Sequence, residues 1–528
     1  MKSIITGNSS FEVLINGGYL YVDKTKYLYE LVKNTGTYYF LSRPRRFGKS
    51  LTLSTLEAIF KGKRELFKGL YIDSMDYDWK EYPVIHIDFS TCIGTSASDI
   101  SDWINRKVVD IGSCYGIKLN KNVEFNYNLD KLIAELTEQE KVVVLIDEYD
   151  SILTNNINNE HIEDIRSTLR GFYSVLKAQA ANIRMCFITG VTKFTKMSIF
   201  STMNNLTDIS MRKAYANMLG YTQQELEDNF AEYIEKGVVE TGKTREKYLS
   251  DIKTWYDGYC FVPKTESVYN PVSVGSFFQE DGTSFKNYWI STGGMPYILT
   301  EVAKRVQFDI SVDTEIEVTP DTLQTPDLIQ MVKTEVSKDN FLSLLYQTGY
   351  LTIKNVDSSD EDDILLLLGY PNKEVKKGLN QILLPLYLGS SYKDFKGERV
   401  LKSFRTGNVN EAMATLTSIY ASIPYHELVF NAENAWHASF VSMLTLIGAQ
   451  ITTEDPTNIG RIDAVITCHK YIYIIEFKFN QSADVAIEQI RNNKYWEKYF
   501  TQGKEIHLLG INFSTEQKNI VEWKDEIL

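Results

Sequence analysis

Apolar and polar positions alternate along the first 220 residues in a pattern that predicts alternating strands and helices. Apolar runs of strand length contain many aromatic and β-branched residues, and segments of helical spacing or composition separate them. Strands that alternate with helices pair in parallel, so we expect an α/β fold with one parallel sheet covered by helices. The expected strands are 38–41, 82–89, 142–146 and 183–190, and the expected helices are 51–60, 97–115, 128–139 and 162–180.

The middle of the chain has a different pattern, with charge-rich helical segments followed by stretches rich in glycine and aromatic residues. Such stretches are usually tight packing corners, and a lid over a bound ligand is the alternative interpretation. Two later apolar runs flank an acidic segment, which predicts a β-hairpin with a solvated tip in a helical, winged-helix-like region. These features are the helices 225–236 and 244–255, the stretches 255–259 and 288–296, and the hairpin strands 350–353 and 364–367.

The last hundred residues return to short apolar runs between helical segments. A helix is expected at 431–447, strands at 460–466 and 471–479, and a second helix at 483–499. This order predicts a smaller and separate α/β domain. The predicted domains are therefore 1–220, 221–425 and 426–528.

The loop after the first strand carries the clearest chemical signal. It reads Arg43-Pro44-Arg45-Arg46-Phe47-Gly48-Lys49-Ser50, and a helix is expected from Leu51. When Gly-Lys-Ser stands between a strand and a helix, backbone N–H groups at the helix start wrap the phosphates of a nucleotide. Lys49 would reach the β- and γ-phosphates of ATP, and the Ser50 hydroxyl would ligate Mg²⁺. The sequence thus predicts a P-loop site for ATP.

One residue of this loop departs from the P-loop pattern G-x-x-x-x-G-K-[ST]. The first glycine would fall at position 43, where the chain has Arg43. This departure leaves open a site that binds nucleotide but scarcely turns it over. Alternatively, three arginines beside the phosphates compensate for a less open turn through charge-assisted contacts. The expected nucleotide-binding residues of the loop are Arg43, Arg45, Arg46, Gly48, Lys49, Ser50 and Leu51.

Acidic residues end the apolar run 142–146 and form the second half of such a site. Asp147 would hold Mg²⁺ together with Ser50, and Glu148 would polarise the attacking water. The alternative is a core strand whose two acids only cap the next helix. The strand 183–190 ends in small polar residues before Lys193, a place for a residue that senses the γ-phosphate, or simply for a polar turn.

A second group of chemically active residues lies near the C-terminus. Glu476 and Lys478 are two positions apart in an apolar strand, so they project from the same face. Asp463, on the preceding candidate strand, could meet Glu476 across the sheet, and paired carboxylates suit Mg²⁺ or Mn²⁺. This is the PD-(D/E)-x-K nuclease pattern, in which the lysine activates a water or stabilises phosphate charge. The alternative is an ion pair of Glu476 with Lys478 beside a turn-capping Asp463.

Three helical residues are weaker candidates for the same site. Glu433, on the helix before the strands, could add a carboxylate to the metal site. Gln489 and Tyr495, on the helix after the strands, could contact the phosphate backbone. Each is also compatible with an ordinary helix position.

Composition and charge limit the classes of function. Hydrophobic residues make up 43% of the chain and charged residues 24%, as in an ordinary soluble protein. The net charge of −13 disfavours a constitutive duplex binder but not a metal-assisted nuclease, whose active site is itself acidic. No apolar run reaches the length of a membrane span, and the five cysteines form no C-x-x-C pair. We therefore expect a cytoplasmic protein that does not contact a membrane.

These motifs together resemble a bacterial family of AAA-ATPase-like proteins, many of which carry a C-terminal PD-(D/E)-x-K nuclease domain. The resemblance implies an AAA-like or STAND-like ATP-binding domain and a bacterial or archaeal setting. It supplies no settled biological role, and roles in defence against mobile DNA or in mobile elements are hypotheses. Gly294-Met295-Pro296 resembles the glycine-x-proline element of STAND proteins. The remaining similar segments are Asp23-Lys24-Thr25, Arg43 to Leu51, Asp147 to Asp150, Phe187 to Val191, Asn204 to Leu206, Gly460 to Asp463 and Glu476 to Lys478.

The hypothesis from the sequence is an ATP-dependent switch that controls a metal-dependent nuclease acting on nucleic acid, more plausibly DNA. Glu148, Asp463, Glu476 and Lys478 are the expected catalytic residues. The alternative is a signalling or scaffold NTPase whose C-terminal domain binds nucleic acid or protein without cleaving it. A homo-oligomer would be needed if an arginine reaches a neighbouring ATP site, and Arg166, Arg170 and Arg212 are candidates by position.

Overall fold

The computed structural model divides the chain into two compact units. The N-terminal unit comprises residues 1–306 and 315–376, and the C-terminal unit comprises 307–314 and 377–528. The structure describes residues 1–193, 203, 205–293, 299, 301–302, 316–323, 336–357, 364–379, 397–422, 440–441, 443–444, 447–457 and 459–528.

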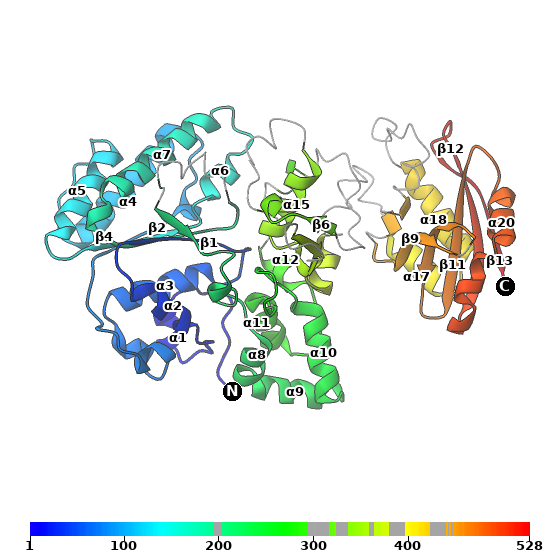
Figure 1. Ribbon diagram of the computed structural model, residues 1–528, viewed down its shortest axis with the longest axis horizontal. Coiled ribbons are helices and arrows are strands. Elements are labelled where there is room, and N and C mark those ends of the chain that lie inside the picture. The colour runs from blue at the N-terminus through cyan, green and yellow to red at the C-terminus, as the bar shows by residue number, and fades with distance from the viewer. Residues whose placement is uncertain are drawn as a thin grey trace. The chain divides into compact units, whose positions relative to one another are not determined.

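A parallel five-stranded sheet forms the centre of the N-terminal unit (Figure 1), as the sequence predicts. Its strand order is β2-β3-β4-β1-β5, and every pair in it is parallel. All residues of β3 and β4 are buried, which explains their continuous apolar sequence. The strands are β1 (Thr37–Ser42), β2 (Val84–Asp88), β3 (Val142–Asp147), β4 (Ile183–Gly190) and β5 (Leu206–Asp208).

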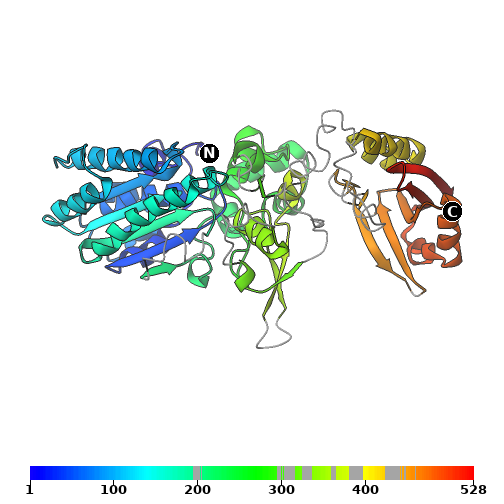
Figure 2. The ribbon, with the colours of Figure 1, turned by 90° about the horizontal axis from the view of Figure 1, so that it is seen from above.

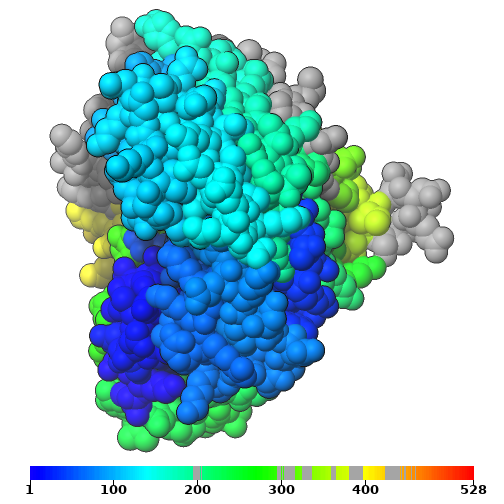
Figure 3. Space-filling view, turned by 90° about the vertical axis from the view of Figure 1, so that its left-hand side faces the viewer, coloured from blue at the N-terminus to red at the C-terminus, as the bar shows by residue number. Residues whose placement is uncertain are grey.

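Helices cover both faces of this sheet, with α4, α5 and α7 on one side and α1, α2 and α3 on the other (Figure 1). In the space-filling view the blue and cyan N-terminal part of the chain makes up most of the visible face (Figure 3). A capping box between Ser96 and Asp99 fixes the start of α4. The helices are α1 (Phe11–Asn16), α2 (Thr25–Val32), α3 (Lys49–Phe60), α4 (Ala97–Cys114), α5 (Phe125–Thr137), α6 (Ser151–Asn155) and α7 (Ile162–Ala178).

Helices and a three-stranded antiparallel sheet complete this unit. The predicted helix 225–236 is two helices, because Phe230 leaves the helical conformation and buries its ring against Phe278. The expected hairpin strands are confirmed as β7 and β8, which run side by side in Figure 2, and the predicted solvated tip at 358–363 lies outside the described residues. The elements are α8 (Gln223–Asn229), α9 (Ala231–Thr241), α10 (Arg245–Tyr256), α11 (Pro271–Glu280), α12 (Tyr288–Gly293), β6 (Ile316–Val318), α15 (Lys338–Gln347), β7 (Thr352–Asp357) and β8 (Leu365–Gly369). A further helix at 373–379 begins in this unit and continues past its last residue, Lys376.

The C-terminal unit is a mixed sheet between two helical layers. Its order is β13-β12-β11-β10-β9, with β11 and β12 parallel and the other pairs antiparallel. One face packs on α17 and α18 and the other on α20 and η9, so alternate strand residues enter two separate cores. The elements are α17 (Gly397–Arg405), α18 (Val409–Ser422), β9 (Ile451–Pro456), β10 (Arg461–Thr467), β11 (Tyr471–Phe479), α20 (Ala483–Asn492), β12 (Glu505–Ser514) and β13 (Asn519–Ile527).

Short 3-10 helices occur in both units. The predicted helix 483–499 ends at Asn492, because Lys494 takes the left-handed conformation and a 3-10 helix follows it. The predicted helix 431–447 falls mostly outside the described residues. Within the described part of the chain, we find no helix that is both long and apolar enough to cross a bilayer. The 3-10 helices are η1 (Arg64–Phe67), η2 (Tyr71–Ser74), η3 (Phe89–Thr91), η4 (Ala180–Asn182), η6 (Lys213–Tyr215), η7 (Asp321–Leu323) and η9 (Tyr495–Gln502).

A buried carboxyl group joins three helices of the N-terminal unit. Glu374 has no exposed surface, and it accepts hydrogen bonds from the Ser273 hydroxyl at 2.6 Å and the Trp289 backbone N–H at 2.7 Å. Burial raises the pKa of Glu374 to about 7, although these hydrogen bonds oppose the shift.

Glu374→Gln should flatten the pH dependence of stability. Because the folded-state pKa is raised above its ordinary value of 4.5, the folded state holds this proton more tightly than the unfolded chain. The stability that results is present below about pH 4.5 and is lost as pH rises through about 7, by up to about 3 kcal/mol. Thermal unfolding midpoints between pH 5 and 8 would test this.

Glutamine keeps the shape and removes the titration, so the midpoint of the variant should fall less with rising pH. The nearby tyrosines Tyr256, Tyr259 and Tyr288 stay neutral over this range, because burial raises the pKa of each. An equal slope in both proteins would contradict the assignment.

Candidate nucleotide and nuclease sites

The loop between β1 and α3 presents a helix start to a cavity. Gly48 has φ +96°, a left-handed conformation that glycine adopts without a steric cost, and α3 begins at the next residue. Lys49 is 3% exposed, and its ammonium group donates to the carbonyls of Arg43 and Pro44, both at 3.1 Å. It also lies 3.5 Å from Glu148 Oε1. The cation expected to meet phosphate is therefore held by oxygens of its own chain.

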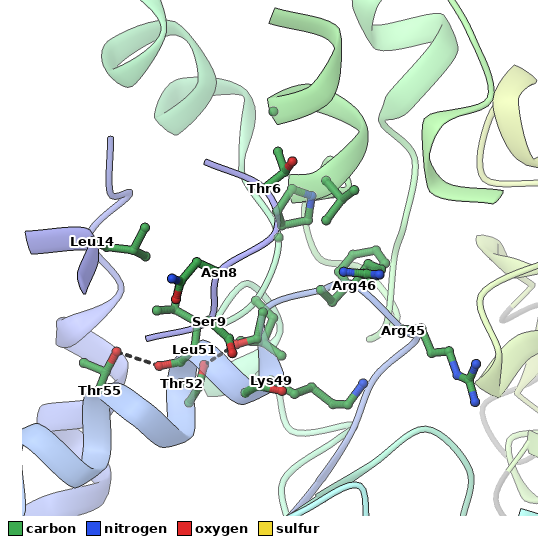
Figure 4. A pocket seen from close by; sticks show the side chains of 18 of the residues that line it. Thr6, Asn8, Ser9, Leu14, Arg45, Arg46, Lys49, Leu51, Thr52 and Thr55 are labelled. Carbon is green, nitrogen blue, oxygen red and sulfur yellow. Dashed lines mark hydrogen bonds between the residues drawn. The ribbon is translucent and has the colours of Figure 1, made fainter. Parts of the chain in front are cut away.

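The cavity beside this loop has a volume of about 520 Å³. Figure 4 shows the N-terminal residues Thr6, Asn8 and Ser9 near the start of α3, with Lys49 extending along the loop. Polar residues of the loop and of the β3 end line the cavity together with apolar residues from distant segments. Its apolar residues include Ile4, Leu14, Val22, Leu28, Met218, Leu219 and Val272, and its polar residues include Lys49, Ser50, Thr52, Asp88, Asp147 and Glu148.

The acidic pair lies at the end of β3, where the sequence predicts it. Asp147 is 3% exposed and accepts a hydrogen bond of 2.5 Å from the Thr189 hydroxyl at the end of β4. This contact exists because β4 is inserted between β1 and β3. Glu148 has φ +50°, which is uncommon for a residue with a side chain and costs backbone energy. Asp147 and Glu148 both line the cavity.

The next two residues bind the end of β4 to the end of β3. The Tyr149 N–H donates to the Thr189 carbonyl at 3.0 Å, and its hydroxyl donates to the Thr192 carbonyl at 2.8 Å. The buried Asp150 carboxylate accepts from the Thr192 N–H at 2.7 Å and its hydroxyl at 2.6 Å. Burial, with Glu148 nearby, raises the pKa of Asp150, and the Thr192 bonds oppose this. These hydrogen bonds were not predicted from the sequence, because the residues that bond to Tyr149 and Asp150 lie about forty positions away in the chain.

The structure places the three arginines of the loop in different surroundings. Arg43 does not line the cavity: its guanidinium donates to the Ser42 and Ser210 carbonyls at 2.9 and 2.7 Å and lies 4.3 Å from the centre of the Phe261 ring. Arg45 and Arg46 do line it, but Arg45 points away from the other labelled side chains in Figure 4. The Arg46 guanidinium donates to the Thr292 carbonyl at 2.8 Å.

The remaining nucleotide-site candidates are engaged elsewhere or lie outside the described residues. Lys193 Nζ lies 2.8 Å from Asp208 Oδ2 on β5. Arg166 pairs with Glu163 at 2.8 Å, and Arg212 is exposed. Gly294, Met295, Pro296 and Asn204 lie outside the described residues.

Two charged residues at the cavity were not assigned from the sequence. Asp88 ends β2 and is in register with Asp147 on the neighbouring strand. The edge rule for parallel strands could have identified it, since carboxyl ends of such strands meet. Lys24 also lines the cavity, and its partly buried ammonium group donates to Glu225 Oε2 at 2.6 Å and to the Asn217 carbonyl at 2.9 Å. Burial lowers the pKa of Lys24, and Glu225 opposes this.

In the C-terminal unit, the structure brings the predicted nuclease residues together. Asp463 on β10 accepts a hydrogen bond of 2.8 Å from the Phe477 N–H on β11. Lys478 Nζ lies 3.1 Å from Glu476 Oε1, and Glu476 is 2% exposed. Since Ile475 and Phe477 enter the core with α17 and α18, Glu476 and Lys478 face α20. The three residues therefore occupy adjacent positions on two paired strands.

The structure treats the three helical candidates for the nuclease site differently. Gln489 on α20 joins the site, because its Oε1 accepts from Lys478 Nζ at 2.8 Å. Tyr495 is buried, with its hydroxyl bonded to Asn493 at 2.9 Å and beside Gly460. Glu433 lies outside the described residues. No group of three or more His, Cys, Asp or Glu side chains in the described ranges is arranged to hold a metal ion.

Comparisons with known proteins agree with both halves of this geometry. The model of the family described as "Predicted AAA-ATPase" matches residues 5–200, and that of the PD-(D/E)XK nuclease superfamily matches 431–523. The chain is 33% identical, over 100% of its own length and 99% of the relative's, to the "Uncharacterized protein in vnfD 5'region" of Azotobacter chroococcum mcd 1. The chain belongs to the AAA-ATPase-like family with a C-terminal PD-(D/E)XK nuclease superfamily domain.

Solved structures give only distant likenesses. The Drosophila ORC bound to DNA is 12% identical over 67% of this chain and 85% of that one, with a TM-score of 0.25. The Aeropyrum pernix ORC2 protein is 11% identical over 69% and 91%, with a TM-score of 0.24. Scores this low support no conclusion about this chain.

Gly190→Ala should destabilise the N-terminal unit by about 2 kcal/mol, because overpacking a buried site costs about 1–3 kcal/mol. A Cβ at this position would lie 2.7 Å from Asp150 Oδ1 and closer still to the Tyr149 ring. Gly7→Ala is the matched control, because nothing lies within 4 Å of its added Cβ. Thermal unfolding would measure the stability of both variants, and equal unfolding midpoints would contradict tight packing of Gly190 against Tyr149 and Asp150.

Proposed function

We propose that the N-terminal unit binds and hydrolyses Mg·ATP and that its nucleotide state controls a metal-dependent nuclease in the C-terminal unit. The observation that carries this proposal is Lys49, a buried lysine at the start of α3, beside a cavity of about 520 Å³. A buried ammonium group needs an anionic partner, which is Glu148 at 3.5 Å in this structure and would be phosphate in the nucleotide complex. Helix N-terminal N–H groups and Lys49 together suit the phosphates of a nucleotide.

The residues fit this ligand. Lys49 would leave the Arg43 and Pro44 carbonyls and Glu148 for the β- and γ-phosphates. The apolar residues that line the cavity would contact the base of the nucleotide. Ser50 and Asp147 would hold a divalent cation, with Asp147 oriented by Thr189. Once released from Lys49, Glu148 would orient the attacking water.

The C-terminal site suits hydrolysis of a phosphodiester. Asp463 and Glu476 would supply two carboxylates to a Mg²⁺ or Mn²⁺ ion, with Glu433 a further candidate. A divalent cation bound at either site supplies a Lewis acid that polarises a phosphate oxygen. Lys478, held by Glu476 and Gln489, would stabilise charge on the phosphate. The substrate would be nucleic acid, more plausibly DNA, in a cytoplasmic bacterial setting related to defence or mobile elements.

Two contacts of Lys478 support a second candidate function. Lys478 is already paired with Glu476 at 3.1 Å and with Gln489 at 2.8 Å, which favours a C-terminal domain that keeps the fold and binds without cleaving. The protein would then be a signalling or scaffold NTPase. The division into domains 1–220, 221–425 and 426–528 remains part of the proposal, as does assembly into a homo-oligomer.

Lys49→Met should lower the affinity for Mg·ATP about a hundredfold, because it removes charge-assisted contacts worth about 3 kcal/mol. Lys61→Met, at the other end of α3, is the control, since Lys61 pairs with Glu57. Calorimetric titration would give both affinities. Wild-type affinity in Lys49→Met would refute the ATP site.

Asp463→Asn and Lys478→Met should each abolish cleavage of DNA or RNA with Mg²⁺ or Mn²⁺ while leaving ATP affinity unchanged. Glu476→Gln should also remove a Mn²⁺ site from calorimetric titrations. Asp484→Asn is the control, because Asp484 is exposed and pairs with Lys524. Equal cleavage by all variants would favour the non-cleaving alternative if Mn²⁺ binding is also unaffected.

A further inference from the structure

The phosphate loop is attached to α12 through both of its middle arginines. The Trp289 indole N–H donates to the Arg45 carbonyl at 3.0 Å, and the Arg46 guanidinium donates to the Thr292 carbonyl at 2.8 Å. Both contacts immediately precede Phe47, Gly48 and Lys49 in the chain. A shift of α12 therefore moves the segment that sets the position of the Lys49 side chain.

Aromatic packing makes this attachment rigid. The buried Phe47 ring meets the rings of Tyr259 and Phe261 at centroid distances of 4.8 and 5.3 Å. Trp289 in turn packs on Tyr350 at 5.2 Å. Gly349 has φ +87°, and a Cβ on it would lie 2.7 Å from Pro44, so the loop and the residues before β7 are in close contact.

Glu374 holds the other side of α12. Its Oε1 accepts the Trp289 N–H at 2.7 Å, so one tryptophan bonds the loop with its indole and Glu374 with its backbone. Its Oε2 accepts from Ser273 on α11, a helix whose residues Val272 and Gly275 line the cavity. Glu374 thus contacts two of the elements that enclose the proposed nucleotide.

The segment that carries Glu374 is fixed in the N-terminal unit immediately before that unit ends. Asn372 donates to the Asp257 carbonyl at 2.8 Å and accepts from the Val375 N–H at 3.0 Å. The unit ends at Lys376, and the chain continues into the C-terminal unit. A displacement of Glu374 therefore acts within three residues of the point where the chain leaves the N-terminal unit.

We propose that Glu374 and Trp289 are positioning residues that couple occupancy of the nucleotide site to the segment 371–376, from which the chain leaves for the nuclease domain. The inference rests on the proposed ATP site and specifies how that site is regulated. Binding of phosphate shifts the loop, Arg45 moves Trp289, and Trp289 moves Glu374. Linkage requires the reverse effect, so loss of either residue weakens nucleotide binding by the coupling factor.

Hydrogen exchange on the full-length protein tests this coupling, with a non-hydrolysable ATP analogue as the probe. In the wild type, saturating analogue should slow amide exchange of peptides covering 371–376 about fivefold. Trp289→Phe keeps an aromatic ring and loses the indole N–H, so the analogue should still bind, about fivefold more weakly, without protecting 371–376. Glu374→Ala should behave in the same way, and Glu374→Gln, which can keep both hydrogen bonds, should restore protection.

Trp103→Phe is the matched control, since Trp103 on α4 packs on Phe89 and should leave protection intact. A purely structural Glu374 would lower the unfolding midpoint of Glu374→Ala while protection persisted, and that result would overturn the coupling. Protection that is absent from an analogue-bound wild type, or unchanged in Trp289→Phe, would also overturn it. A wild type that binds no analogue would refute the ATP site itself, and the coupling with it.

Discussion

The buried guanidinium of Arg43 is the constraint around which the N-terminal unit is organised. Removing a cation from water is expensive, and burial lowers the pKa of Arg43 to about 10. The cost is offset by carbonyls of Ser42 and Ser210 and by the Phe261 ring. These partners belong to the sheet edge and to the region after α10, so one side chain joins the loop to segments 167 and 218 positions away in the chain. A glycine at position 43 could make none of these contacts.

The two sites share one electrostatic arrangement. In each, a lysine expected to meet phosphate is paired with a carboxylate of the same site, Lys49 with Glu148 at 3.5 Å and Lys478 with Glu476 at 3.1 Å. Pairing lowers the cost of burying the charge without substrate. Under the proposed function, an incoming phosphate would compete with an internal anion, so each site would discriminate against weakly charged ligands.

Most of the strands could be predicted from the sequence, because a buried strand needs a continuous apolar run and little else in the chain supplies one. The strand-end carboxylates followed from the same logic. The strand order did not, since periodicity carries no information about which strands are neighbours, and the contact of Thr189 with Asp147 depends on that order. The orientation of the Arg43 side chain could not be predicted either, because its partners are distant in sequence. The break at Phe230 also depends on tertiary packing, whereas the run of β12, buried from Ile506 to Phe513, was overlooked although it could have been predicted.

The close fit of Pro44 against Gly349 has a consequence for how such chains diversify. A side chain at 349 would push directly on the loop, and a bulkier residue at 44 would meet the backbone after α15. The two positions therefore form a matched pair, although they lie in different predicted domains. An ATPase domain and a middle region taken from different ancestors would fit together only if they carried compatible residues at positions 44 and 349. Recombination within the family should therefore occur at other places in the chain than between these two regions.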